Sequence, residues 1–399
     1  MLKPTPAADG EHLKTGRLLP CLTGHRPSRA SASPPDRPLI GVLEGNGIGP
    51  DIIGGALRVL AALGEVAGLR FEVRHGGPIG EPAEARFKKA LPDSVAEFCA
   101  DVFAGGGAIL NGPAGGRYVY DLRRRFDLFC KFIPVRPWPQ LAHAGRIAPQ
   151  YLQHLDLLIV RDNAGGVYQG QWENRLTAAG RLAEHVFSYT ESQVYRLVEV
   201  AVRAAAGRRG LLHIIVKDGG VPGITALWRE VGLALARKHG VTAACMNVDL
   251  AAYELLQHPA KFDVIVAPNL FGDILADLAG VLLGSRGTTF SGNFDAAGRA
   301  VYQTNHGCAQ DLAGKDVANP AGQILSLAMM LRESFGLGDA ARRIEDSLAE
   351  AWRQGWRTED LAEPGCRVVG TRAMTDQVVQ QIFRLAEKNR PHEIRAAAG

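Results

Sequence analysis

Apolar and polar positions follow two different patterns along most of the chain. Short, mostly apolar runs, such as Leu39–Leu43 and Leu155–Val160, are typical of strands that are buried on both faces. Between such runs lie longer segments, such as Glu191–Ala206, in which apolar residues recur at the spacing of an amphipathic helix. This alternation of strands and helices from Pro38 onward predicts an α/β fold.

Residues 1–37 do not follow this pattern, because they are rich in Pro, Ser and Arg and have no apolar period. Such a composition predicts a flexible N-terminal extension. Its basic residues make a transit peptide conceivable, but prolines and acidic residues near the start would spoil the amphipathic helix that such a peptide needs. An ordinary tail, or an upstream start codon wrongly chosen, explains the segment better.

The composition narrows the class of protein. A chain of 399 residues is long enough for two domains, and 46% hydrophobic with 22% charged residues describes a soluble globular protein. The formal net charge is only +4 and no basic run alternates with aromatics, so we expect no nucleic-acid partner. No apolar stretch reaches the roughly 18 residues that span a bilayer, so we expect no membrane partner.

The six cysteines are scattered along the chain and include no CxxC pair. This usage is typical of a reducing compartment, and it argues against a disulfide framework or a zinc site. We therefore expect a cytoplasmic protein.

The sharpest chemical signal is a pair of carboxylates, Asp273 and Asp277, in a segment predicted to be helical. Their four-residue spacing places both on one helix face, among apolar neighbours that make an uncompensated charge costly to bury. The preceding strand, Phe262–Ala267, brings this helix to the carboxyl edge of the sheet, where open α/β sheets bind ligands. Paired oxygen ligands suit Mg²⁺ or Mn²⁺. The alternative is one capping aspartate and one exposed aspartate.

Other charged residues also end predicted strands or open the helices that follow them. Arg161 ends one buried strand, and a Gly-Gly pair and Tyr168 come shortly after it. Equivalent positions after later strands are held by Lys217 or Asp218 and by Asp249. Because the carboxyl ends of parallel strands meet at one edge, we expect these groups to converge on an active site.

Two further segments each allow two interpretations. The Gly-rich turn Glu44–Asp51 precedes a predicted helix, Ile52–Leu63, and such turns often hold phosphate, but this one lacks both GxGxxG and a P-loop lysine. The run Arg123, Arg124 and Arg125 forms either an exposed face or an anion clamp.

Five motifs occur in an order that is known from one family. Asn46–Pro50 resembles DGIGP, Arg161–Tyr168 resembles a strand with Arg and then GGxY, and Leu227–Val231 resembles the helix after a catalytic lysine. Asn269–Asp277 resembles NxFGDILSD, and His306–Asn319 resembles HGSAPDIAGK…N. The chain thus resembles the isocitrate/isopropylmalate dehydrogenase family, whose members are metal-dependent, NAD(P)-dependent β-decarboxylating dehydrogenases.

The resemblance runs from about residue 39 to about residue 385 and implies a two-domain fold with the second domain inserted in the first. The large α/β domain on the cofactor side would comprise residues 38–128 and 284–399. The inserted α/β domain would be residues 129–283. The family dimerises through this inserted domain, so the resemblance implies a homodimer with shared active sites. The family's lysine position and its first metal aspartate act on the partner's site.

The resemblance also implies roles for individual residues. The three aspartates that bind the family's divalent metal, and with it the 2-hydroxy acid substrate, match Asp249, Asp273 and Asp277. Tyr168 matches the tyrosine associated with protonating the enol carbon. Two of the three arginines that hold the substrate carboxylates match Arg123 and Arg161.

The cofactor positions are similarly implied by the resemblance. Residues lining the family's adenosine pocket match His306, Gly307 and Asn319. Asp311 matches the acid that hydrogen-bonds the adenosine ribose in NAD users. A carboxylate there repels a 2′-phosphate, so the resemblance implies NAD as cofactor.

The first departure from the family concerns its catalytic lysine. Alignment on Trp228 places Asp218 at that position, with Lys217 one residue earlier. Neighbours on a strand point to opposite faces, so Lys217 reaches the cleft only if the strand end bends, which the following Gly-Gly pair permits. Otherwise Asp218 could serve as the base.

Two more departures concern substrate recognition. The third arginine is replaced by Ile133, and Lys131 on the same strand face compensates only as a point charge. The loop between Gly116 and Arg123 is shorter than in many members, and in the family this segment recognises the substrate's distal group. Val119 and Tyr120 fall closest to that segment here.

Two function hypotheses follow. The first is an NAD- and divalent-metal-dependent oxidoreductase that oxidises, and is expected to decarboxylate, a 2-hydroxy acid related to isopropylmalate or isocitrate, with altered substrate recognition. The alternative is a non-catalytic or regulatory relative that binds nucleotide or ligand without turnover. The three metal aspartates and Tyr168 favour the enzyme. The displaced lysine and the lost arginine favour the alternative.

Overall fold

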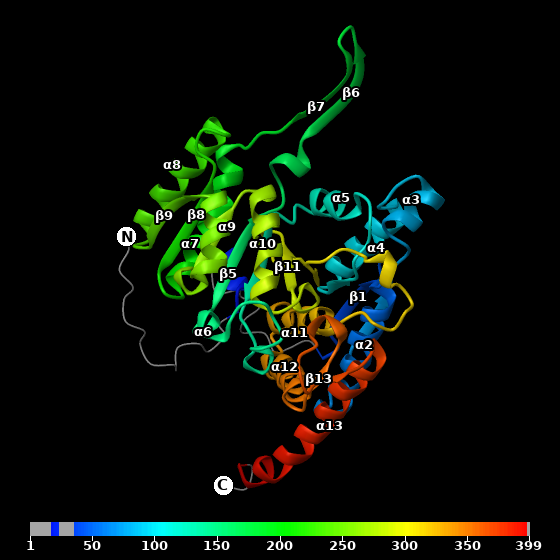
Figure 1. Ribbon diagram of the computed structural model, residues 1–399. Coiled ribbons are helices and arrows are strands. Elements are labelled where there is room, and N and C mark those ends of the chain that lie inside the picture. The colour runs from blue at the N-terminus through cyan, green and yellow to red at the C-terminus, as the bar shows by residue number, and fades with distance from the viewer. Residues whose placement is uncertain (1–16, 24–35, 397–399) are drawn as a thin grey trace.

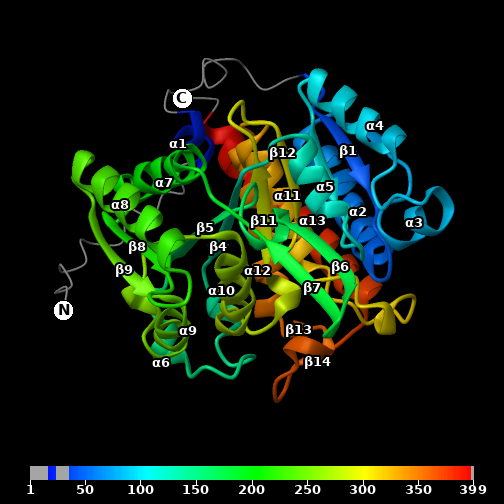
Figure 2. The same cartoon turned by 90° about the horizontal axis from the view of Figure 1, so that it is seen from above.

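The computed structural model describes residues 17–23 and 36–396, with side chains up to residue 388. The predictions about residues 1–16 and 24–35, including the transit peptide, lie outside the described residues. The described chain forms three layers, in which helices cover both faces of a mostly parallel sheet (Figures 1 and 2). The predicted α/β fold is confirmed. No helix in this part of the chain is both long and apolar enough to cross a membrane.

The main sheet is built from ten strands of the described chain. They are β1 (Leu39–Leu43), β2 (Glu72–His75), β3 (Ala108–Asn111), β4 (Cys130–Val135), β5 (Leu157–Asp162), β8 (Leu211–Val216), β9 (Thr242–Asn247), β10 (Val264–Ala267), β11 (Phe290–Phe294) and β12 (Ala300–Thr304). Their order across the sheet is β2-β1-β3-β12-β11-β4-β5-β10-β8-β9. Two parallel blocks, β2-β1-β3-β12 and β5-β10-β8-β9, are joined by the antiparallel neighbours β11 and β4.

Helices connect and cover these strands. They are α1 (Leu19–Thr23), α2 (Gly49–Ala67), α3 (Glu81–Phe87), α4 (Asp93–Ala104), α5 (Tyr118–Arg125), α6 (Pro149–Leu152), α7 (Glu191–Ala206), α8 (Pro222–Lys238), α9 (Val248–Gln257), α10 (Asn269–Leu282), α11 (Ala321–Glu333), α12 (Gly338–Arg353) and α13 (Thr371–Ala396). Short 3₁₀ turns are η2 (Pro139–Leu141), η3 (Val167–Gln169), η4 (Pro259–Lys261), η5 (Arg286–Thr288), η6 (Gln310–Leu312) and η7 (Glu359–Leu361). Outside the main sheet lie the hairpin β6 (Gln171–Thr177) and β7 (Gly180–Val186), and the short pair β13 (Trp356–Arg357) and β14 (Arg367–Val368).

Alternate residues of each strand enter different cores, which explains the continuous apolar runs of the sequence. In β5, Leu158 and Val160 join a large core beneath α7, α8 and α11, whereas Leu157 and Ile159 join a second core beneath α9 and α10. The first core extends without a break under both parallel blocks.

The predicted division into two domains stays a prediction. Strands from residues 38–128 and 284–399 lie on one side of the β11–β4 pair, and strands from residues 129–283 lie on the other. The sheet and the first core are nevertheless continuous across that line.

Capping residues determine where the helices begin and end, and they can extend a helix beyond its periodic apolar residues. α7 occupies the predicted range, and Thr190 and Gln193 close a capping box at its start. α2 is longer at both ends than the predicted Ile52–Leu63. Pro50 fits the first turn of a helix, and Gly68 in the left-handed conformation ends it, so both ends are set by capping residues beyond the apolar period.

Residues 17–23 correct the prediction of a wholly flexible extension. In α1, Leu19 and Leu22 are buried in the large core, and Leu19 lies against Gly298 in the turn between β11 and β12. The backbone N–H of Leu19 donates to Glu333 at the end of α11 over 3.0 Å. A helix of five residues is too short to show an apolar period, so the sequence carried no signal for it.

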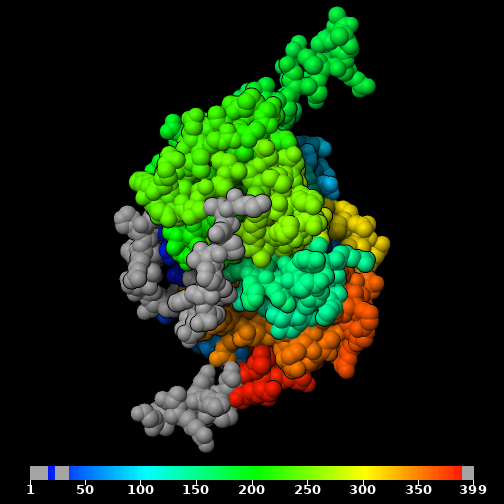
Figure 3. Space-filling model, turned by 60° about the vertical axis from the view of Figure 1, so that its left-hand side comes forward, coloured from blue at the N-terminus to red at the C-terminus, as the bar shows by residue number. Residues whose placement is uncertain are grey.

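The hairpin of β6 and β7 projects from the rest of the molecule (Figures 1 and 3). Three of its large apolar side chains, Trp172, Leu176 and Val186, are exposed. A two-stranded hairpin is only marginally stable in water, so this one is expected to gain stability from a surface that covers it.

Candidate active site

Three adjacent strands deliver the central residues of the site to one edge of the sheet. Lys131 on β4 and Ala267 at the end of β10 are both paired in register with Arg161 on β5. α10 begins two residues after Ala267, and its Gly272 lies so close to Arg161 that an added Cβ would be 2.7 Å from the arginine Cγ. The structure thereby brings Lys131, Arg161 and Asp273 together.

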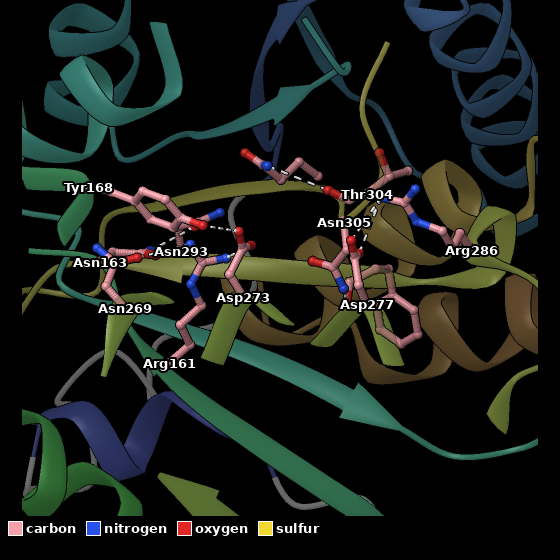
Figure 4. Close-up of polar contacts among 12 residues, drawn as sticks. Arg161, Asn163, Tyr168, Asn269, Asp273, Asp277, Arg286, Asn293, Thr304 and Asn305 are labelled. Carbon is pink, nitrogen blue, oxygen red and sulfur yellow. Dashed lines mark hydrogen bonds and ion pairs between the residues drawn. The ribbon is translucent and has the colours of Figure 1, made fainter. Parts of the chain in front are cut away.

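Asp273 is the centre of this group (Figure 4). Its carboxylate forms an ion pair with Arg161 and accepts a hydrogen bond of 2.9 Å from the Tyr168 hydroxyl. Arg161 also donates to Asn269 Oδ1 at 2.9 Å, which fixes the orientation of the guanidinium. Burial by itself would raise the pKa of Asp273, but the charges of Arg161 and Lys131 outweigh it and hold that pKa below its ordinary value. Burial and then the charge of Asp273 raise the pKa of Tyr168, so the phenol keeps its proton.

Two other cations of this region have no ionic partner among the residues that the structure describes. Arg123 on α5 is 4% exposed and Lys131 is 3% exposed, and within the described chain neither forms a hydrogen bond or an ion pair. Burial, aided by the charge of Arg161, lowers the pKa of Arg123 to about 10. Burial likewise lowers the pKa of Lys131 well below its ordinary value. Buried cations without a partner are costly, so they indicate an anionic ligand.

The other predicted substrate positions are more ordinary. Ile133, at the position of the family's third arginine, is buried in the core beneath α10. Arg124 and Arg125 are exposed, as the solvated-face interpretation of the arginine run expects. Of that run, only Arg123 is turned into the protein.

Asp277 lies one turn beyond Asp273 on α10, and its carboxylate is 3.0 Å from the guanidinium of Arg286 (Figure 4). Both carboxylates offer the hard oxygen donors that Mg²⁺ or Mn²⁺ prefers. The negative charge of each also raises the pKa of Lys131, against the larger effect of burial. In the described part of the chain, however, no three His, Cys, Asp or Glu side chains form a group that could hold a metal. The described residues of one chain thus bring together two of the three predicted metal ligands.

The third predicted ligand, Asp249, belongs to a separate exposed group at the start of α9. Lys217 Nζ lies 3.0 Å from Asp249 Oδ1, and this hydrogen bond is the main cause that lowers the pKa of Asp249. Asp218 lies 2.5 Å from the guanidinium of Arg229 instead. These four residues form no hydrogen bond or ion pair with the group around Asp273. Within one chain, the structure does not unite the predicted base with the predicted proton donor.

The loop that carries most predicted cofactor residues packs on the Gly-rich turn after β1. The N–H of Ile48 donates to the carbonyl of Cys308 over 2.9 Å. Gly47 has a φ of +62°, and an added Cβ would lie 2.0 Å from the same carbonyl oxygen, so only glycine fits there. The turn thus supports the loop.

The four cofactor positions differ in how free they are. His306 is half-buried, and burial lowers its pKa, so its imidazole is neutral at pH 7. Gly307 has open space around it, and Asp311 on η6 is exposed and unpaired within the described residues. Asn319 has a structural role, because its side chain accepts from the N–H of Ala321 at 2.9 Å and donates to an Asp360 oxygen at 3.0 Å.

Tyr120 belongs to a row of aromatic and guanidinium groups that the sequence did not predict. Its ring centre lies 5.3 Å from that of Tyr168. The guanidinium of Arg117 lies 5.2 Å from the Tyr120 ring and 4.5 Å from the Trp172 ring, and it donates to the carbonyl of Tyr168 over 3.2 Å. Arg117 precedes Tyr120 by three residues, so helical spacing was an available signal.

The fold and the site together define the class of protein. A family model described as isocitrate/isopropylmalate dehydrogenase matches residues 39–378, and the chain belongs to this family. The resemblance found in the motifs is therefore confirmed.

Individual relatives agree with this assignment. The chain is 37% identical over 358 residues to 3-isopropylmalate dehydrogenase of Chromobacterium violaceum, with 85% of this chain and 99% of that protein covered. It is 34% identical over 363 residues to the enzyme of the same name from Aquifex aeolicus, with 87% and 98% covered. Among solved structures, isocitrate dehydrogenase from Methylococcus capsulatus matches with a TM-score of 0.76 and 28% identity, over 86% of this chain and 99% of that one.

Proposed function

We propose that this protein is an NAD- and divalent-metal-dependent dehydrogenase that oxidises a 2-hydroxy acid and releases one of its carboxyl groups as CO₂. The observation that carries the proposal is the group of Arg161, Tyr168 and Asp273 beside the unpaired buried cations Arg123 and Lys131. Relatives named 3-isopropylmalate dehydrogenase and isocitrate dehydrogenase support this reaction class. The departures around Tyr120 support a changed recognition of the substrate's distal group.

Substrate binding is assigned to the cations. Arg123 and Lys131 would hold the carboxylates of the substrate, since within the described chain they have no anion of their own. Arg161 is held in place by Asn269 and Asp273, so it offers a fixed guanidinium edge at the strand end. Their burial excludes water from the bound carboxylates and strengthens each contact.

Two proton transfers are assigned to side chains. The substrate hydroxyl must lose its proton while the hydride on the same carbon passes to the nicotinamide; Lys217 is the proposed base and Asp218 the alternative. After the bond to the leaving carboxylate breaks, Tyr168 protonates the enol carbon. Its raised pKa supports this role, because the proton is retained until a strong carbon base is present.

The metal would be held by Asp249, Asp273 and Asp277. When bound, a divalent cation acidifies the hydroxyl and stabilises the negative charge that develops on its oxygen. The set of hard carboxylate donors fits Mg²⁺ or Mn²⁺, provided that Asp249 comes from a second copy of the chain. NAD is assigned to His306, Gly307 and Asp311, and Asn319 would shape the pocket by accepting a hydrogen bond from the N–H of Ala321 at the start of α11.

A homodimer with shared active sites follows as part of the proposal. Its support is the incomplete ligand set of one chain together with exposed apolar side chains on α9, α10 and the β6–β7 hairpin. On α9 and α10 these are Leu250, Tyr253, Ile274 and Val281. A second copy packed on α9 and α10 would cover them and bring its own Asp249 and Lys217 towards Asp273.

The proposal is tested by screening 2-hydroxy acids with NAD and Mn²⁺ while following the absorbance of the reduced nicotinamide. We expect turnover with at least one acid that carries a second carboxylate, loss of turnover with a chelator, and recovery when Mn²⁺ is restored. If nucleotide or acid binds, as measured by calorimetry, yet no acid is oxidised, the non-catalytic alternative is the correct one.

A further inference from the structure

The turn η3 carries Tyr168, the proposed proton donor, and each of its three backbone carbonyls accepts a hydrogen bond from a basic side chain. A 3₁₀ turn of three residues has little support of its own, so its place depends on such contacts. Proton donation to a carbon atom requires the phenol at one place, which makes the fixing of η3 part of the chemistry. The donors to the carbonyls of Val167, Tyr168 and Gln169 are, in that order, His185 at 2.6 Å, Arg117 at 3.2 Å and Arg124 at 3.4 Å.

Gln169, the last residue of this turn, uses every polar group of its side-chain amide. Its Nε2 donates to the carbonyl of Tyr120 and to the carbonyl of Asn163, each over 3.2 Å. Its Oε1 accepts from Nε of Arg124 at 3.0 Å. The amide therefore joins η3 to α5 at two points and to the segment after β5 at a third.

Asn163 is a rigid anchor for that amide. It is fully buried directly after β5, and its Nδ2 donates to Asn293 on β11 at 2.9 Å (Figure 4). Its backbone N–H donates to the carbonyl of Phe129 over 2.9 Å. The carbonyl that accepts from Gln169 is thus fixed to the middle of the sheet.

On α5, the same amide fixes the ring that packs against the proton donor. The Tyr120 ring centre lies 5.3 Å from that of Tyr168, and the two planes are tilted by 49°. Gln169 binds the carbonyl of Tyr120 and directly follows Tyr168 in the chain, so one side chain determines the spacing of the two rings. The Tyr168 hydroxyl then lies 2.9 Å from the Asp273 carboxylate, at the centre of the site.

We propose that Gln169 is the positioning residue of the proton transfer: it ties η3 to Asn163 and to α5, and thereby holds the Tyr168 phenol where it reaches the enol carbon. This rests on the proposed function and deepens it. Tyr168 is the group that would touch the substrate, and Gln169 acts only through it. Without the amide, η3 would depend on the three carbonyl contacts, two of which come from the exposed side chains His185 and Arg124.

The test compares Gln169→Leu and Gln169→Glu with a matched control, Gln171→Leu. Leucine removes all polar atoms of the side chain, whereas glutamate keeps the acceptor for Arg124 but has no N–H for the two carbonyls. Gln171 is the same residue type two positions further along the chain, and it is exposed. For each protein, kcat, KM and the solvent isotope effect on kcat are measured in H₂O and D₂O with NAD, Mn²⁺ and isopropylmalate, or isocitrate if that is the acid oxidised.

We expect both Gln169 variants to lose about 10- to 100-fold in kcat while KM changes less than about threefold, since a misplaced phenol slows the chemistry and leaves the carboxylate contacts in place. The solvent isotope effect should rise in both, because proton transfer to carbon becomes the slow step. Gln171→Leu should match the unchanged protein. An unchanged kcat in both Gln169 variants would overturn the inference. A fall in kcat without a larger isotope effect would show a purely structural role and would overturn it as well.

Failure of the proposed function is recognised separately. If the unchanged protein oxidises neither acid, the proposed function fails, and carbon-13 NMR of labelled tyrosine then tests the positioning alone. The Tyr168 signal is assigned by its absence in Tyr168→Phe. A signal that shifts or splits in both Gln169 variants, and not in Gln171→Leu, supports the inference. A Tyr168 signal that the Gln169 variants leave unchanged refutes it.

Discussion

At the scale of single residues, Asp273 shows what the sequence contained and what it did not. The four-residue spacing between Asp273 and Asp277 correctly predicted that both lie on one helix. It gave no sign of the positive charges that offset them. The structure gives each a cation, Arg161 for the first and Arg286 for the second. Arg161 could be expected from its strand end. Arg286 could not, because it follows a loop whose path depends on the whole fold.

The displaced lysine is the residue whose role the structure constrains most. Lys217 and Asp218 follow β8 and turn to different partners, Asp249 and Arg229. Since Lys217 already lies beside the predicted metal ligand, we expect Lys217→Ala to lose about 10²- to 10⁴-fold in kcat. Asp218→Asn should lose less than about tenfold, because its partner Arg229 is exposed. Steady-state kinetics of both variants decide the matter, and the reverse ranking would make Asp218 the base.

Asp311 carries the cofactor prediction. It is exposed and unpaired in the described chain, so its carboxylate is available to a ribose diol and repels a 2′-phosphate. The protein should prefer NAD over NADP by at least about tenfold, roughly 1.4 kcal/mol in differential binding. Asp311→Lys should narrow or reverse that ratio of kcat/KM values. Equal use of both cofactors by the unchanged protein would contradict the assignment.

At the scale of elements, buried strands and long helices were predictable, whereas short or exposed elements were not. β5 is apolar at consecutive positions because its two faces enter two cores, and α7 is apolar at helical spacing because one of its faces enters one core. Both patterns are local properties of the sequence. The hairpin of β6 and β7 has no buried residue, so no alternation of buried and exposed positions distinguishes it from a loop. α1 is stabilised by Glu333, which is 314 residues away in sequence, and no local pattern reports such a contact.

Glu333 gives the contact with α1 a measurable signature. Burial raises the pKa of Glu333 from 4.5 to about 7, although the N–H of Leu19 and the charges of Arg17 and Arg332 lower it. Between these values the folded state holds a proton that the unfolded state has lost. The stability contributed by protonated Glu333 is therefore present below about pH 4.5 and is lost as the pH rises through about 7.

Glu333→Gln should remove this decrease of stability with rising pH, which is on the order of 3 kcal/mol in the free energy of unfolding. Urea denaturation at pH 5 and at pH 8 measures it as the difference between the variant and the unchanged protein. Glu84→Gln, at an exposed position, is the matched control and should follow the unchanged protein. A Glu333→Gln variant with the same pH dependence as the control would show that the carboxyl is ionised in the fold.

At the scale of the whole molecule, the sequence predicted a convergence of strand ends that one chain achieves only in part. Arg161, Tyr168 and Asp273 meet, whereas Asp249 and Lys217 pair with each other on an exposed surface. The sequence indicates which residues have suitable chemistry, but it does not say which subunit of the proposed dimer would supply each one. In that proposal, the exposed apolar side chains of α9 and α10 are the surface that a second copy would cover.

The central claim, a dehydrogenase site completed by a second copy, is tested most directly by mixing two inactive variants. Asp249→Asn and Asp273→Asn should each abolish Mn²⁺-dependent oxidation of the best 2-hydroxy acid. After the two are unfolded and refolded together, half of the dimers are mixed, and each mixed dimer has one site with both aspartates. The mixture should therefore recover about a quarter of the activity of the unchanged protein. Mixed dimers are identified by an affinity tag on one variant only, which co-purifies the other variant. If the mixture contains such dimers and still stays as inactive as either variant refolded alone, the two aspartates do not meet across subunits and the account is wrong.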